Sequence, residues 1–132
     1  PLAEEEAAQQ ALLAAVVARD GAMAKPLLEI LENPSYSNDL RADTMFWLAF
    51  LAAEKALGPI QKILTGDDEA VELRTTAVFA LAQLDGPKIV PRLMEIARTS
   101  KEPELQQAAF FALADHDTPE VRRLFEEILL SP

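Results

Sequence analysis

The residues of this chain that could do chemistry are few and lie among acids. The single histidine, His116, stands between Asp115 and Asp117. A metal site or a nucleophilic active site would need further ligands or a nucleophile at a fixed spacing from it, and the sequence offers none. His116 also takes the place that Leu51 and Leu84 hold at the ends of two similar segments. We therefore interpret His116 as a structural residue.

Two other acidic groups suggest chemistry only at first sight. The run Asp67-Asp68-Glu69 lacks the alternating spacing and the glycine of a calcium-binding EF-hand loop, so we interpret it as a helix-capping segment. Glu126 and Glu127 are adjacent on a predicted helix and point in different directions, which does not suit an acid–base pair. There is no glycine-rich phosphate loop, no serine nucleophile motif and no cysteine. The sequence thus predicts no enzyme, no metal and no cofactor.

Three stretches of the chain have nearly the same pattern, and they define the elements. They begin at Leu40, Leu73 and Leu105, at spacings of 33 and 32 residues. Such a period is typical of solenoids, in which each unit is a helical hairpin that cannot bury its apolar face alone. The abundance of Ala and Leu favours helix. We predict an all-α fold, a right-handed α-solenoid of antiparallel helical hairpins.

Four hairpins fit the chain as a single domain, residues 1–132. Their approximate ranges are 3–34, 39–66, 69–100 and 102–130. The start at Pro1, without Met, suggests a piece of a longer protein or a mature chain whose leader is gone. In the turns at 85–87 and 117–119, we expect proline at the first helical position, with Gly86 or Thr118 as the N-cap.

An amphipathic stripe in each first helix predicts the core. A small residue at the second position of the stripe should let neighbouring helices approach closely. We also assign the column of Phe46, Phe79 and Phe111 to the core, and we expect Trp47 to pack against the Ala-rich first hairpin. The predicted stripe consists of Leu40, Thr44, Leu48 and Leu51, then Leu73, Ala77, Leu81 and Leu84, then Leu105, Ala109 and Leu113.

This layout resembles the HEAT-repeat family, especially its short bacterial type. The resemblance rests on the starts Leu40-Arg41-x-x-Thr44 and Leu73-Arg74-x-x-Ala77, the Ala-Leu-Ala tracts at 80–82 and 112–114, and the Asp-x-Pro turns. It covers residues 39–130 well and 3–34 loosely. It implies a stack of hairpins that serves mainly as an adaptor.

The resemblance also implies a ladder of arginines. In HEAT proteins the arginine at the start of the first helix often bonds to an aspartate of a loop, which would make Asp85 and Asp117 the partners of Arg41 and Arg74. Gln106 takes the arginine's place in the last unit, and this departure puts the ladder in doubt there.

Catalytic and DNA-processing relatives do not match. HEAT-based metal-dependent hydroxylases carry paired His-Glu motifs, which this chain lacks, and DNA-processing members present a basic concave face. An accessory or lyase-type member, similar to phycobilin lyases or phycobilisome-degradation factors, remains open, although no motif selects it.

The net charge of −10, from 22 acids and 12 bases, limits the partners. It argues against nucleic acid, which needs a basic stripe, and against an anionic membrane surface. A basic protein partner is compatible with it. No apolar run approaches the length of a transmembrane helix. The cytoplasm is slightly favoured as location, and the periplasm stays open if a leader has been removed.

We therefore predict a non-catalytic scaffold that binds a protein or peptide on the concave face formed by the second helices. The alternative is a structural spacer or self-associating segment of a longer array, favoured by the Ala-rich first helix and the apolar end Leu129-Leu130. The predicted face has mixed charge and an exposed methionine. Its candidate residues are Lys25, Glu29, Gln61, Lys62, Arg92, Met94, Glu95, Arg123, Glu126 and Glu127.

Overall fold

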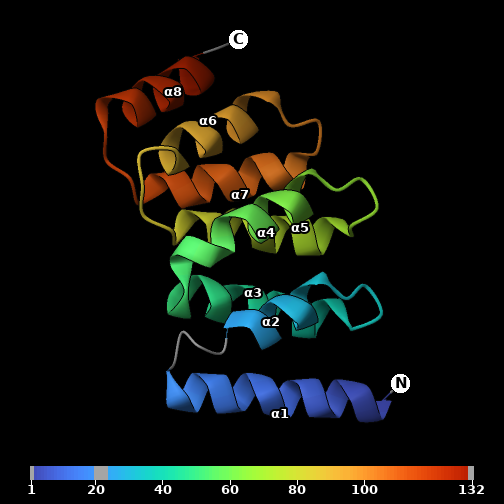
Figure 1. Ribbon diagram of the computed structural model, residues 1–132. Helices are drawn as coiled ribbons and strands as arrows, with labels where there is room; N and C mark the ends of the chain where they lie inside the picture. Colours follow the sequence, from blue (N-terminus) through green and yellow to red (C-terminus); the bar gives the residue numbers. More distant parts are fainter. Residues whose placement is uncertain (1, 20–23, 131–132) are drawn as a thin grey trace.

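The computed structural model describes residues 2–19 and 24–130, and this part of the chain consists of eight α-helices and no strand. The predicted all-α solenoid is confirmed (Figure 1). The first helices of the hairpins are α1 (Leu2–Ala18), α3 (Asn38–Leu51), α5 (Val71–Ala82) and α7 (Pro103–Ala114). The second helices are α2 (Ala24–Glu32), α4 (Ala53–Thr65), α6 (Ile89–Thr99) and α8 (Pro119–Leu130).

The hairpins stack in chain order, with α1 at one end of the molecule and α8 at the other (Figure 1). The turns between α3 and α4, between α5 and α6 and between α7 and α8 follow one edge, on the left of the view, and the loops between hairpins follow the opposite edge. Helices α3, α5 and α7 pack directly on one another, and each of α2, α4 and α6 packs on the first helix that follows it. Contacts between successive second helices are sparser, so grooves remain between them.

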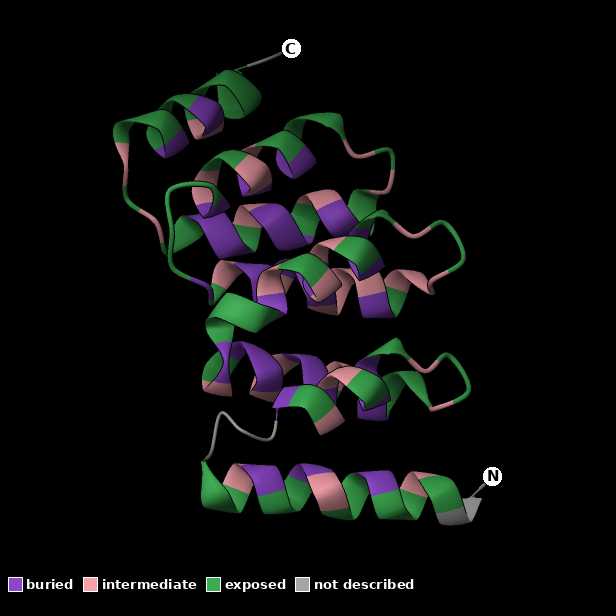
Figure 2. Cartoon of the chain, viewed as in Figure 1, coloured by how far each residue is buried: buried purple, intermediate pink, exposed green. Residues whose placement is uncertain are grey.

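The predicted stripe forms a continuous buried seam through the stack (Figure 2). Every member is buried except Leu51, which is half-buried. The small residues Thr44, Ala77 and Ala109 are fully buried, as the close packing of α3, α5 and α7 requires. The Thr44 hydroxyl donates to the Leu40 carbonyl at 2.8 Å, which satisfies this polar group inside the core.

The aromatic column assigned to the core was partly wrong. Phe111 is 69% exposed, and Phe46 and Phe79 are half-buried. Consecutive residues on a helix point about 100° apart, so Phe110 and Phe111 cannot both face inward. Phe110 takes the inward position and stacks on Phe125, with ring centroids 5.8 Å apart.

The arginine ladder exists, but its acceptors are glutamates rather than Asp85 and Asp117. Arg41 is buried, donates through Nε to the Leu31 carbonyl at 2.9 Å and grips the Glu69 carboxylate at 2.8 and 3.3 Å.

The next rung repeats this arrangement one unit later. Arg74 donates through Nε to the Glu69 carbonyl at 3.1 Å and binds the Glu102 carboxylate with both terminal nitrogens. Glu69 therefore serves two rungs, one through its side chain and one through its backbone. In the last unit, Gln106 donates only to the Ala97 carbonyl, at 3.4 Å. The expected interruption of the ladder, where Gln106 replaces the arginine, is therefore confirmed.

The carboxylates of Glu69 and Glu102, near the starts of α5 and α7, thus belong to the ladder, and neither makes a capping bond. The N-cap of α5 is Ala70, which makes no side-chain cap bond, so the capping interpretation of the acidic run at 67–69 was wrong. The predicted N-cap Thr118 is confirmed, because its hydroxyl accepts from the Val121 N–H at 3.2 Å. Pro87, expected at the first position of a helix, instead lies in a turn before α6, where Gly86 has a φ of 144°.

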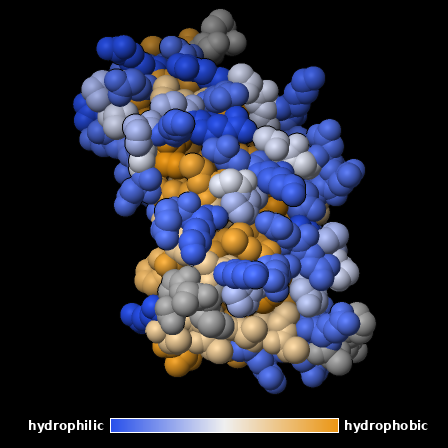
Figure 3. All heavy atoms as spheres, viewed as in Figure 1, coloured by the Kyte–Doolittle hydropathy of each residue, from blue (hydrophilic) through white to orange (hydrophobic). Residues whose placement is uncertain are grey.

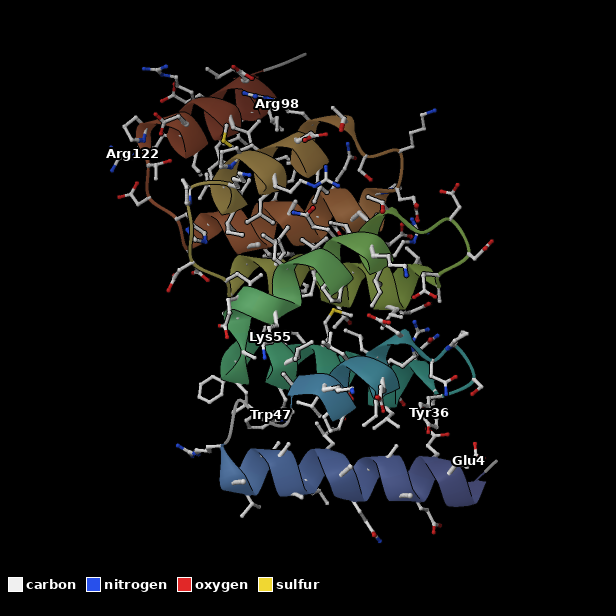
Figure 4. All side chains as sticks on the ribbon, in the orientation of Figure 1. Glu4, Tyr36, Trp47, Lys55, Arg98 and Arg122 are labelled. Atoms are coloured by element: carbon white, nitrogen blue, oxygen red, sulfur yellow. The ribbon has the colours of Figure 1, made fainter. Side chains whose placement is uncertain are left out.

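Helix α1 closes one end of the stack. It buries Ala8, Leu12 and Ala15, and the backbone N–H of Ser37, at the start of α3, donates to the Glu5 carboxylate at 3.3 Å. Trp47 is half-buried and lies between α3 and α1 in Figure 4, on the side where the Ala-rich first hairpin was expected to receive it.

Candidate protein-interaction surface

The second helices are positioned by inward-facing branched aliphatic side chains. In α4 these include Ile60 and Ile63, and in α6 Leu93 and Ile96, all nearly or fully buried. Their helical spacing leaves the opposite side of each helix for polar residues. The ten candidate residues, which we call the second-helix face, lie on α2, α4, α6 and α8.

Most of the second-helix face is open to solvent, but not all of it. Gln61, Arg92 and Met94 are half-buried. The expectation that Met94 is an exposed methionine was wrong, since it packs against the hydrophobic core. The other members are exposed, namely Lys25, Glu29, Lys62, Glu95, Arg123, Glu126 and Glu127.

The second-helix face is electrically balanced although the chain carries a net charge of −10. It contains four basic and four acidic residues, so their formal charges sum to zero. Arg92 and Glu95 pair one helical turn apart at 3.2 Å, and Arg98 of α6 reaches Glu127 of α8 at 3.4 Å. Water reaches at least one partner of each pair, so the pairs contribute little stability and their charged groups can exchange partners.

Two grooves run into this face. One lies between α6 and the start of α8, has a volume of about 580 Å³, and is lined by Val90 and Met94 with Glu95 and Arg98 at its rim. The other lies between α2 and α4, has a volume of about 340 Å³, and includes Lys62. Figure 3 shows hydrophobic surface gathered in separate patches framed by hydrophilic side chains. Such apolar hollows with polar rims suit the recognition of protein side chains.

The profile of HEAT repeats matches the chain twice, over residues 24–114 and 67–132. The matches span α2 to α8, which are the helices that form the seam, the ladder and both grooves. The chain belongs to the HEAT-repeat family. No curated protein matches it, and no solved structure matches it. Helix α1 lies outside the matched residues, in keeping with the looser resemblance at 3–34.

HEAT repeats generally mediate protein–protein interaction or act as scaffolds. In the described part of this HEAT chain, no three His, Asp or Glu side chains converge as metal ligands. His116 is half-buried in the turn before α8, where its backbone N–H donates to the Leu113 carbonyl at 2.9 Å. Within the ranges 2–19 and 24–130, no helix is both long and apolar enough to cross a membrane.

An ion pair near His116 shifts the pKa values of both its members, Asp117 and Arg122. Arg122 donates two hydrogen bonds to the Asp117 carboxylate, at 2.7 and 2.9 Å. These bonds, and then the positive charge of Arg122, lower the pKa of Asp117 below its ordinary value of 3.8. The same contacts raise the pKa of Arg122. Both side chains are largely exposed, so the pair is a local ion pair in the turn and no acid–base site.

The HEAT array exposes two large aromatic residues that the sequence pattern did not single out for binding. Phe50, at the end of α3, is 65% exposed, and Phe111 of α7 was assigned to the core. The sequence did contain a signal that Phe50 is exposed. Phe50 lies two residues after Leu48, which places it on the side of α3 that faces away from the buried stripe.

Proposed function

We propose that this HEAT chain is a non-catalytic scaffold that binds a protein or peptide on the second-helix face. The observation that carries the proposal is the charge-balanced face around an apolar groove between α6 and α8, within a family that generally serves protein interaction. The balanced charge supports a partner that presents both signs of charge. The groove supports an apolar anchor at the centre of the contact.

The test compares partner capture by three forms of the chain. The variant Lys62→Ala/Arg92→Ala/Glu95→Ala removes two bases and one acid from the second-helix face. Since these residues are exposed or half-buried, the free energy of unfolding should change by no more than about 1 kcal/mol. Proteins captured from native lysate by the wild type should be lost with this variant.

A second variant serves as a matched control, because it removes the same number of charges outside the second-helix face. Lys55→Ala/Lys101→Ala/Glu104→Ala also removes two bases and one acid, all exposed and outside the second-helix face. It should capture the same proteins as the wild type. Unchanged capture by the first variant, or equal loss with both variants, would refute the assignment.

A structural role is the second candidate, and specific exposures favour it. Leu13 and Val17 of α1 are 62% and 82% exposed, and Leu129 and Leu130 of α8 are 82% and 81% exposed. Apolar outer faces on the two end helices suit packing on further repeats or on a copy of the chain. Sedimentation velocity at rising concentration separates the candidates, because a scaffold that acts alone should remain monomeric while a self-associating segment should not.

A further inference from the structure

The edge that carries the turns inside the hairpins has hollows beside its exposed aromatic rings. The larger lies between the α3–α4 and α5–α6 turns and has a volume of about 490 Å³; its walls include Phe50, Leu57 and Leu84. The smaller lies between α5 and α7, has a volume of about 220 Å³, and is lined by Phe79 and Phe111.

The two hollows adjoin. Gln83, at the end of α5, lines both of them. Phe50 and Phe111 therefore lie on either side of one helix end, and a bound segment could contact both rings. Single exposed aromatics are ordinary on protein surfaces, but two rings with an apolar hollow beside each form a continuous contact surface.

The rims of these hollows are acidic. Glu54 and Asp85 line the larger hollow and Asp115 lines the smaller. None of the three forms an ion pair with any described residue. No lysine or arginine lines either hollow. The lining of the two hollows therefore differs from the balanced second-helix face and complements positive charge.

We propose that this acidic aromatic edge binds a basic peptide segment of a partner protein, with two apolar side chains in the hollows and lysine or arginine between them. Neighbouring packed helices lie about 8–10 Å apart. A bound segment in the polyproline II conformation rises about 3.1 Å per residue with three residues per turn, so every third side chain points to the same side. Apolar residues three positions apart therefore match the spacing of the hollows. The site is separate from the second-helix face and does not depend on it.

The probe is a fluorescently labelled peptide, acetyl-Leu-Lys-Lys-Leu-Lys-Lys-amide, with a counterpart in which glutamate replaces every lysine. Fluorescence anisotropy should show binding of the lysine peptide only, weakened by salt as charge complementarity requires. The variant Phe50→Ala/Phe111→Ala should bind it at least tenfold more weakly. Both rings are more than half exposed, so circular dichroism should show an intact fold.

The contribution of the acidic residues is tested separately from that of the two phenylalanine rings. Glu54→Gln/Asp85→Asn should bind the lysine peptide several-fold more weakly. Asp67→Asn/Asp68→Asn also removes two negative charges, but at the opposite edge, and should leave the affinity for the lysine peptide unchanged. Lys62→Ala/Arg92→Ala/Glu95→Ala should also bind normally, which makes failure of this proposal distinguishable from failure of the second-helix face.

A second readout reports on the site in the unaltered chain. Trp47 is the only tryptophan, and its ring meets that of Phe50 edge-on, with centroids 5.8 Å apart. Binding should therefore change Trp47 fluorescence, whatever the stability of the variants. The proposal is overturned if the lysine peptide does not bind, if loss of both phenylalanines has no effect, or if the two charge variants weaken binding equally. It is also overturned if sedimentation shows a dimer of the wild type that the Phe50→Ala/Phe111→Ala variant does not form, because a second copy of the chain would then cover the edge.

Discussion

The Arg41–Glu69 rung should be the costliest ion pair to break. The side chains of Arg41 and Glu69 are 6% and 18% exposed, and both terminal guanidinium nitrogens bond to the carboxylate. Replacing Glu69 with alanine leaves a buried guanidinium whose remaining acceptor is the Leu31 carbonyl. Removing one partner of a fully buried pair costs about 3–5 kcal/mol. Since water can reach the Glu69 position, we expect Glu69→Ala to lower the free energy of unfolding by about 3 kcal/mol.

A double-mutant cycle separates the pair from the packing around it. Arg41→Met keeps much of the apolar stem and removes the charge. Urea unfolding followed by circular dichroism, for the wild type, both single variants and the double variant, should give a coupling of about 2 kcal/mol, because hydrogen bonds to charged groups contribute about 1.5–3 kcal/mol. The Glu69→Ala variant should melt about 10 °C below the wild type.

The chain contains a matched control for this cycle. Arg122 and Asp117 also form a two-pronged bond, at 2.7 and 2.9 Å, but both side chains are largely exposed to solvent. The equivalent cycle, Arg122→Met with Asp117→Ala, should show a much smaller coupling than the Arg41 rung, because water screens exposed ion pairs. Equal coupling in the two cycles would refute the reasoning that burial makes the Arg41 rung strong, as would a cost of less than about 1 kcal/mol for Glu69→Ala.

Three further changes test the local physics of the helices and turns. Gly58→Ala should stabilise the chain by less than about 1 kcal/mol. Alanine favours the helix and its Cβ would meet nothing within 4 Å beyond its chain neighbours, but a Cβ directly before Pro59 opposes part of the gain. Gly86→Ala should instead destabilise the chain because a φ of 144° disfavours a side chain; melting shifts of the same sign would contradict this. The lowered pKa of Asp117 means that its pair with Arg122 stabilises the fold above about pH 4 and that this contribution is lost as the pH falls through the lowered pKa. Asp117→Asn should therefore lose less stability than the wild type between about pH 4 and pH 2 in acid-unfolding profiles. Amide exchange should be slowest in α5, which packs on α3, α4 and α7, and fastest among the matched helices in α8, which buries only Val121 and Leu124; equal protection would argue against nearest-neighbour stabilisation.

The repeat period made the seam predictable, because burial in a solenoid recurs at the same position of every unit. Leu40, Leu73 and Leu105 are all nearly fully buried, as their spacing required. Side-chain direction was harder to predict where two apolar residues are adjacent. The choice between Phe110 and Phe111 depended on where α8 places Phe125, which is a tertiary contact that no local pattern contains.

The acceptors of the ladder were missed although a signal for them was present. Glu69 and Glu102 each follow their arginine by 28 residues, so the spacing repeats with the period of the array. The family resemblance pointed instead to aspartates in the turns inside the hairpins. Those turns lie at one edge of the stack, whereas Arg41 and Arg74 lie near the starts of α3 and α5, which begin at the opposite edge (Figure 1). The length of a helix therefore separates these arginines from the aspartates of the turns.

The distribution of charge connects the two proposed surfaces. The second-helix face has no net charge, so the excess of acids lies elsewhere, including the edge with Glu54, Asp85 and Asp115. Long-range attraction therefore draws a basic partner toward the molecule without favouring the balanced face, since steering depends on the total field. Discrimination at that face must come from short-range contacts in its grooves, whereas the acidic edge combines attraction and apolar contact in one place. A basic segment should therefore bind first at the edge, and a partner that covers both surfaces would gain affinity from the link between them.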